Sequence, residues 1–467
     1  MSILINKNEV KKDLSILVKS FIQIHQNQPG LMPVSILASI ASAVYPFINI
    51  YMSALIVDKL VYRNWNELIT LAAITVLLNL IFGLLCNGLT HLKSIQEKMF
   101  YNKQKQITSN KAMELDYESL ESAATHEKIR RLDDMHEITG MRLDTLARIA
   151  ARLTQSIIKF VFAIILVVNC FKTVELIAKS ELTTKFAEFM NSPFTSVIFV
   201  LFITALIVIN TYLSFKHGRF YFKFEEDSLP LKKMTWYYDR EYFDTYRTGK
   251  EIRIFRQSTI INRSYNETIK NNAELCNKLG TMQGRYNGFS ALTTVLSSGV
   301  IYLYVSLKAL AGIFSVGSIV KYVGAITQLC DSIQSIIADV VALKQLLRWL
   351  RLYWDYMDTE DVNYKGILSV ENGNCNEYEI EFKNVSFKYT GTDKYVLKNL
   401  NMKLYMGQRL AVVGMNGSGK TTMIKLLCRL YDPTDGEITL NGINIKKYNP
   451  VEYMNIFSVV FQDFKLF

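Results

Sequence analysis

The chain has few charged residues for its length. Only 20% of its 467 residues are charged, whereas 50% are hydrophobic, and soluble proteins usually carry about 25% charged residues. The mean hydropathy is accordingly positive, at +0.13. This balance predicts a membrane protein with soluble parts, in a chain long enough for more than one domain.

Cysteine motifs for disulfides or zinc are also lacking. The six cysteines are scattered, several lie in apolar runs, and no C-x-x-C occurs. We therefore expect neither a disulfide framework nor a zinc site. Residues 1–30 are polar and mixed in charge, so they lack the short apolar core of a cleavable signal peptide.

No basic-aromatic nucleic-acid-binding module is visible, although the net charge is +11. Lys and Arg gather instead in two long polar stretches between apolar segments. We expect no nucleic-acid partner. The positive-inside rule accounts for the same charges, and it predicts that both stretches and both termini are cytoplasmic.

Six apolar segments are each long enough to cross a bilayer, which takes roughly 20 residues. They lie near residues 31–60, 68–89, 157–174, 194–215 and 289–310, and the sixth begins near residue 313. The gaps after the second and fourth segments are long. The stretch "SIQEKMFYNKQKQITSNKAMEL" contains neither Pro nor Gly, which predicts a helix continuing well below the membrane.

The character of the chain changes after Trp354. A polar stretch follows, and from Glu379 the apolar period becomes two, as in Ile380 and Phe382, which indicates strands. We therefore predict an N-terminal cytoplasmic segment (1–30), a six-helix transmembrane domain (31–345), a linker (346–376) and the first part of a soluble α/β domain (377–467).

The stretch "GQRLAVVGMNGSGKTTMIKLLCRLYDP" has the order strand, Gly-rich turn, helix. "LAVV" is the predicted strand, and "TTMIKLLCRL" has helical spacing. Within it, "GMNGSGKTT" fits the phosphate-binding pattern G-x-x-x-x-G-K-[ST]. Backbone N–H groups and the helix N-terminus would stabilise phosphate, with Lys420 on the β- and γ-phosphates and the Thr421 hydroxyl on Mg²⁺. The predicted nucleotide-binding residues are Gly414, Asn416, Gly417, Ser418, Gly419, Lys420, Thr421 and Thr422. A Gly-rich turn without a ligand is the less favoured alternative.

Residues 379–467 resemble the ATP-binding cassette (ABC) transporters, specifically exporters with six spans fused to one nucleotide-binding domain. "IEFKNVSFKYTGTDKYVLKNLNMKLYMGQRLAVVGMNGSGKTTMIKLLCRLYDPTDGEITLNGINI" follows the family's opening pattern, and "FSVVFQDFKLF" resembles the strand and Q-loop that come next. The implied fold is a multi-pass α-helical membrane domain of the type I exporter kind, followed by a partial α/β P-loop NTPase domain.

The resemblance implies further roles. Tyr389 matches the aromatic residue that stacks on adenine, although a strand residue packed on the core would look similar. Gln462 matches the Q-loop glutamine, which contacts Mg²⁺ and the attacking water, so Lys420 and Gln462 are the implied catalytic residues. Regions 116–129 and 238–255 match the coupling helices by position, although an ordinary solvated helical face would look the same.

The resemblance also implies a mechanism and partners. Two cassettes close on two ATP molecules and switch a membrane cavity between inward- and outward-facing states. The expected partners are a second half-transporter, identical or different, membrane lipids and the transported substrate, and the expected location is the plasma membrane.

Several motifs of the family are missing from these 467 residues. No "LSGGQ"-like signature, Walker B strand ending in Asp-Glu or switch His follows the Q-loop. Phosphoryl transfer depends on such positioned groups, so we do not expect this chain alone to hydrolyse ATP. We expect an incomplete reading frame or a cropped sequence. A non-hydrolysing subunit that pairs with a complete partner is the alternative, and a P-loop with another purpose, such as phosphorylation, is disfavoured by "SFKY" and "FQD".

The sequence does not reveal the substrate, and a lipid, a drug-like compound or a peptide remains open. Lys321, Gln328 and Asp331 lie at spacings compatible with one face of the sixth span. Ionisable residues at membrane depth are candidates for function, so these three are candidates for lining the cavity. A snorkelling Lys321 and a helix-contact role for Asp331 are the alternatives.

Overall fold

The computed structural model describes residues 7–168, 170–171, 181–243, 248–359, 366–370 and 378–460. The chain divides into two compact units. Residues 1–103 and 134–350 form the first, here called the helical unit, and residues 104–133 and 351–467 form the second, here called the C-terminal unit.

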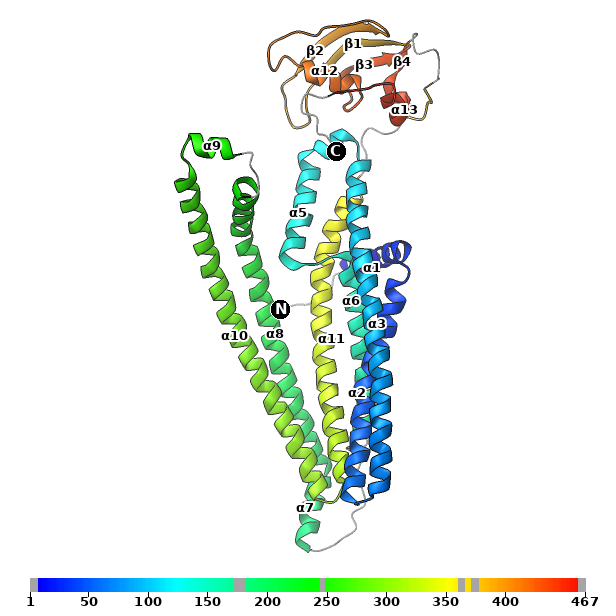
Figure 1. The fold of residues 1–467 in the computed structure, drawn as a ribbon, viewed down its shortest axis with the longest axis vertical. Helices are drawn as coiled ribbons and strands as arrows, with labels where there is room; N and C mark the ends of the chain where they lie inside the picture. The colour runs from blue at the N-terminus through cyan, green and yellow to red at the C-terminus, as the bar shows by residue number, and fades with distance from the viewer. Residues whose placement is uncertain are drawn as a thin grey trace. The chain divides into compact units, whose positions relative to one another are not determined.

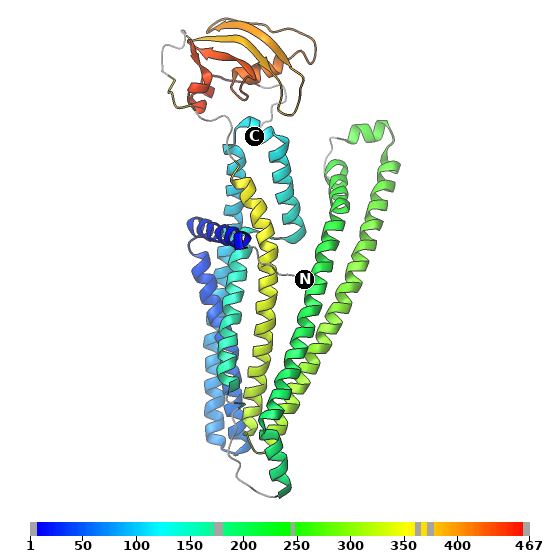
Figure 2. The same cartoon turned by 180° about the vertical axis from the view of Figure 1, so that it is seen from behind.

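Long helices build the helical unit. They are α1 (Lys7–Asn27), α2 (Leu31–Val61), α3 (Trp65–Glu114), α6 (Leu143–Val168), α7 (Glu181–Asn191), α8 (Pro193–Tyr238), α9 (Gly249–Ile254), α10 (Ser258–Leu310) and α11 (Val316–Met357), and a short π-helix (Asp239–Phe243) follows α8. Both α3 and α11 continue into the C-terminal unit, as does α5 (Ala123–Thr139). Within the unit, α8 runs beside α10 and α2 beside α6 (Figures 1 and 2).

Six of these helices are long and apolar enough to cross a membrane: α2, α3, α6, α8, α10 and α11. The prediction of six spans is therefore confirmed. The expected helical extension is also present, because α3 continues without interruption to Glu114. In α3, Val76 and Leu84 are 70% and 67% exposed, and such a surface is stable against lipid rather than against water.

The core of the helical unit joins α6, α8, α10 and α11. Phe199 of α8 stacks on Tyr304 of α10 with ring centroids 4.0 Å apart, and the Tyr304 hydroxyl shares a hydrogen bond of 2.8 Å with Ser196. This aromatic contact holds α8 against α10, since a stacked pair adds to the area that it buries.

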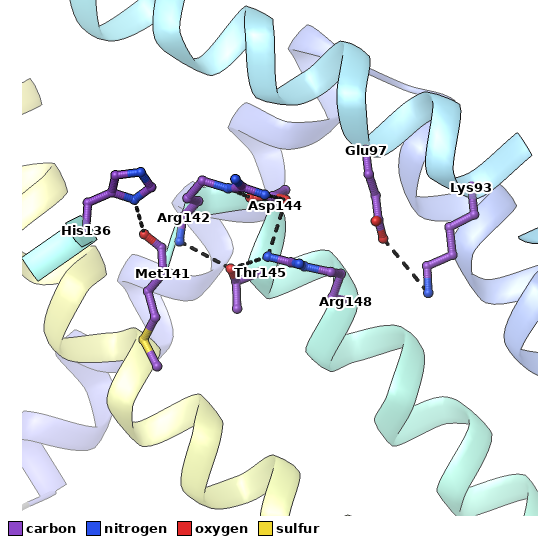
Figure 3. A network of polar contacts seen from close by, with 8 residues as sticks. All are labelled: Lys93, Glu97, His136, Met141, Arg142, Asp144, Thr145 and Arg148. Carbon is purple, nitrogen blue, oxygen red and sulfur yellow. Dashed lines mark hydrogen bonds and ion pairs between the residues drawn. The ribbon is translucent and has the colours of Figure 1, made fainter. Parts of the chain in front are cut away.

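A buried carboxylate fixes the start of α6 (Figure 3). Asp144 accepts two hydrogen bonds from Arg142, of 2.9 and 2.8 Å, and lies 3.4 Å from Arg148. The Arg142 guanidinium also lies 4.5 Å from the ring centroid of Tyr101 in α3. The hydrogen bonds with Asp144 raise the pKa of Arg142. The buried charge is thus fully paired, as burial of an ion requires.

The described part of the C-terminal unit contains a four-stranded antiparallel sheet in the order β2-β1-β3-β4. Its strands are β1 (Glu379–Phe387), β2 (Leu397–Tyr405), β3 (Asp435–Leu440) and β4 (Ile443–Asn444). The short helices α4 (Tyr117–Glu121), α12 (Lys420–Leu427) and α13 (Pro450–Met454) belong to the same unit. Alternate residues of β1, such as Ile380 and Phe382, enter the core, which is the burial expected from the period of two.

One predicted strand is wrong. Residues 409–413, which contain "LAVV", have no strand pairing, and Val412 and Val413 are 43% and 89% exposed. A buried parallel strand needs neighbours on both sides, and no described segment pairs with this one. Residues 457–460 of the expected Q-loop strand are likewise unpaired, and Val460 is 87% exposed.

Candidate functional site: the glycine-rich loop and its neighbours

The glycine-rich loop leads directly into α12, as the motif predicts. Gly417 and Gly419 have φ angles of +79° and +91°, which favour glycine because a Cβ is strained there. A Cβ on Gly419 would also lie 2.8 Å from Leu397 Cδ2. The loop therefore depends on glycine at this position for two separate reasons.

Lys420 folds back over the loop. Its Nζ donates hydrogen bonds to the carbonyl oxygens of Gly414 (2.7 Å) and Met415 (2.9 Å). Residues 414–418 of the loop are exposed, whereas Gly419 is buried and Lys420 is half-buried, so an anion can reach the loop beside the ammonium. A cation and free backbone N–H groups at a helix start are the donors that a polyphosphate uses.

The two threonines after Lys420 differ in their surroundings. Thr421 is exposed, whereas Thr422 is buried and its Oγ1 shares a hydrogen bond of 3.0 Å with the Tyr389 hydroxyl. Thr421 is therefore the hydroxyl accessible to a metal ion. The described residues contain no group of three or more His, Cys, Asp or Glu that could hold a metal. A magnesium ion fits this loop only together with the phosphates of a nucleotide, the usual way in which Mg²⁺ is bound.

Tyr389 lies close to the glycine-rich loop but packs against other aromatic rings. Its centroid is 5.0 Å from that of Phe387 and 5.4 Å from that of Tyr431, both in edge-on contacts. The half-buried ring also lines a cavity of 570 Å³ with residues 387–393 and Glu118. Tyr389 is thus held beside Thr422 by its hydroxyl and by the aromatic rings of the core.

Lys425, in the last turn of α12, lies among three tyrosine rings. Its Nζ is 5.1 Å from the centroid of Tyr117, 5.7 Å from that of Tyr389 and 5.5 Å from that of Tyr431. We call these four residues the Lys425 cluster. Burial opposes the charge of Lys425, but a hydrogen bond with Tyr117 and the nearby Glu121 raise its pKa overall. The ammonium therefore stays charged for cation–π contacts.

The Lys425 cluster joins α12 to α4. Tyr117 of α4 makes an edge-on contact with Tyr431 at 5.6 Å, and Lys425 lies 3.8 Å from Glu121. Thr390 also donates a hydrogen bond of 2.9 Å to Glu118. Part of the first expected coupling region, 116–129, thus contacts the segment that carries the loop. Sequence patterns gave no sign of this, because the four residues are up to 314 positions apart (431 minus 117).

The other predicted site residues are placed as follows. Gln462 lies outside the described residues. In α11, Asp331 lines a cavity of 430 Å³ beside α6, whereas Lys321 and Gln328 are not among its lining residues. The sequence analysis missed three charged residues in this cavity: Arg152, Lys159 and Asp339. Two of them lie on α6, which begins at residue 143 and not near residue 157.

The sequence profile of the ABC transporter family matches residues 397–467. The subtilin transport ATP-binding protein SpaT of Bacillus subtilis is 30% identical over 217 residues, which is 46% of this chain and 35% of that protein. The ATP-dependent lipid A-core flippase of Wigglesworthia glossinidia brevipalpis is 30% identical over 191 residues, 38% of this chain and 32% of the flippase. The mitochondrial iron-sulfur clusters transporter ATM1 of Candida glabrata is 27% identical over 215 residues, 45% of this chain and 29% of ATM1.

These matches span about a third of the length of each relative. The names of these relatives describe two transport proteins and a flippase. Residues 397–467 of this chain therefore match the ABC transporter family, and the six helices of membrane-crossing length ahead of them support a multi-pass membrane protein.

Proposed function

We propose that this protein takes part in ATP-driven export across the plasma membrane, as one half of a dimer of half-transporters. The observation that carries the proposal is the geometry of the glycine-rich loop, with two positive-φ glycines, Lys420 at the start of α12 and an exposed Thr421. Bound ATP with Mg²⁺ would supply the free energy of closure. Lys420 would hold the β- and γ-phosphates, Thr421 would ligate the metal, and Tyr389 would support the adenine.

The contacts within the C-terminal unit support a route from nucleotide to membrane helices. The Lys425 cluster ties the helix that follows the loop to α4, and α4 follows directly on the span α3. A second segment, α9, has no buried residue, and the nearby Ile254 and Phe255 are 74% and 67% exposed. We propose that these apolar side chains dock on a cassette, since an exposed aromatic-aliphatic pair is a typical docking surface.

The test is the Lys420→Ala variant of the protein expressed from its native gene. ATP affinity should fall about tenfold or more, because charge-assisted contacts to phosphate are lost, and transport should stop. Lys403→Ala is the charge-matched control, since Lys403 lies on β2 and pairs with Glu379 at 3.0 Å. Unchanged nucleotide binding and transport in Lys420→Ala would overturn the proposal.

The same preparation separates the two forms of the proposal. Protein that binds ATP and hydrolyses it alone is an active half-transporter. Protein that binds ATP, but hydrolyses it only after a second ABC protein is added, is instead a non-hydrolysing subunit of a heterodimer. Both forms of the proposal use the same nucleotide site, so both predict weaker ATP binding in Lys420→Ala.

A further inference from the structure

A cavity of 430 Å³ lies between two membrane-spanning helices of the helical unit, α6 and α11. Its lining residues recur at helical spacing on each helix, so each helix contributes one face. They are Arg152, Gln155, Ser156 and Lys159 on α6, and Asp331, Ser332, Ser335, Ala338, Asp339 and Ala342 on α11. Only the two alanines are apolar, so the cavity is suited to a polar ligand.

Two of the four charged residues in this cavity pair with each other. Arg152 Nε lies 2.7 Å from Asp339 Oδ1, and the Asp339 side chain is only 6% exposed. The same contact is also a hydrogen bond, so the two opposite charges compensate each other. The pair therefore leaves no net charge on its part of the lining.

The other two charges face the same cavity without a close contact. Lys159 of α6 and Asp331 of α11 both line the cavity. In the described part of the chain, neither residue takes part in an ion pair or a hydrogen bond. An opposite pair held apart in this way offers one anionic and one cationic contact to a ligand between them.

The surroundings of Asp331 indicate that this face meets water. Asp331 is exposed on the helical unit, and an ionisable residue within a span faces a bundle interior or a water-filled cavity rather than lipid. Polar groups continue beyond it towards α8 and α10. Asn210 donates a hydrogen bond of 3.0 Å to Gln334 and accepts one of 3.1 Å from Ser290.

We propose that Lys159 and Asp331 bind a zwitterionic group of the transported substrate, with its ammonium on Asp331 and its carboxylate or phosphate on Lys159. A ligand of one charge sign would pair with only one of the two residues, whereas a zwitterion pairs with both. Ser332, Ser335 and Gln155 supply hydrogen bonds around the group. That the ligand is the transported substrate rests on the proposed export function. Binding at this site, however, can be measured without ATP.

The test uses three fluorescent probes of similar size on the purified protein in neutral-lipid nanodiscs, without nucleotide. Nε-dansyl-lysine carries both charges, dansyl-cadaverine only the ammonium, and 6-(dansylamino)hexanoic acid only the carboxylate. We expect Nε-dansyl-lysine to bind about tenfold or more tightly than either of the others. Equal binding of all three would overturn the proposal.

Variants assign the two contacts. Asp331→Asn and Lys159→Gln should each weaken Nε-dansyl-lysine binding about tenfold or more. The double swap Lys159→Asp with Asp331→Lys should restore binding, since it keeps one charge of each sign. Lys344→Gln, on an exposed part of α11 outside the cavity, should bind as the unaltered protein does. Native-like binding in both single variants would contradict the assignment.

Two further arms complete the experiment. Unlabelled β-alanine and phosphoethanolamine compete for the site if the anionic group is a carboxylate or a phosphate, respectively, and failure of both to compete would overturn the proposal.

The Lys420→Ala variant should bind the probe normally, so a failure of the ATP-driven function is distinguishable from a failure of this site. Thermal unfolding curves identify any variant that does not fold, and the double swap then carries the test.

Discussion

At the scale of single residues, the glycine-rich loop shows how a motif and its packing differ. The motif requires Gly419 for the close approach of phosphate, but the structure adds a second requirement, because Leu397 and the carbonyl of Val396 lie close to the position that a Cβ on Gly419 would take. The motif was readable from nine consecutive letters. The Leu397 contact was not, because it joins positions 22 apart (419 minus 397).

Gly419→Ala should therefore be more damaging than an alanine at another positive-φ glycine. Gly391 has a φ of +83° with nothing within 4 Å of an added Cβ, so Gly391→Ala carries only backbone strain, about 1 kcal/mol or somewhat more. Gly419→Ala carries similar strain together with a steric clash. Thermal unfolding and ATP titration of the two variants, side by side, measure the difference. Equal behaviour of the two would show that Leu397 yields at no cost.

At the scale of elements, prediction succeeded for a helix with its own backbone hydrogen bonds and for a strand whose two neighbours are present, and it failed where no described segment pairs with the predicted strand. Helix α3 and the strand β1 follow from their own apolar periods. The "LAVV" segment has equally apolar letters, yet it forms no strand, because a parallel strand depends on partners that its own sequence does not contain. The start of α6 was missed for another reason: its polar face, with Arg152 and Lys159, looks unlike a membrane span.

The contact between α12 and α4 is a second element-scale feature, and it is testable through Lys425. Lys425→Met keeps the aliphatic stem but removes the charge shared with Tyr117, Tyr389 and Tyr431. Cation–π contacts of this kind contribute about 0.5–2 kcal/mol, so backbone amides of α4 should exchange hydrogen about two- to thirtyfold faster. Hydrogen-exchange mass spectrometry checks this, and Lys403→Met is the control. Unchanged protection of α4 would show that Tyr117 packing alone holds the contact.

At the scale of the whole molecule, the distribution of charge sets the orientation in the membrane. The two basic stretches fall on the polar extension of α3 and on the segment that joins α8 to α10. Both stretches are on the same side of the bilayer if α3, α6, α8 and α10 alternate in direction. The positive-inside rule assigns that side to the cytoplasm, which we propose for this protein.

Cys276 provides a direct test of that orientation. It is exposed and lies in α10, 13 residues before the apolar segment that begins near Phe289 (289 minus 276), and at 1.5 Å per residue this is about 20 Å along the helix. A membrane-impermeant maleimide should therefore label Cys276 in inside-out vesicles and not in right-side-out vesicles. The experiment is done in a Cys375→Ser background, because Cys375 lies outside the described residues, and Cys276→Ser serves as the unlabelled control. Labelling from the outer face would place the basic stretches outside the cell. The Lys425 cluster and the glycine-rich loop would then have no access to cytoplasmic ATP, and the proposed export function would fail with the orientation.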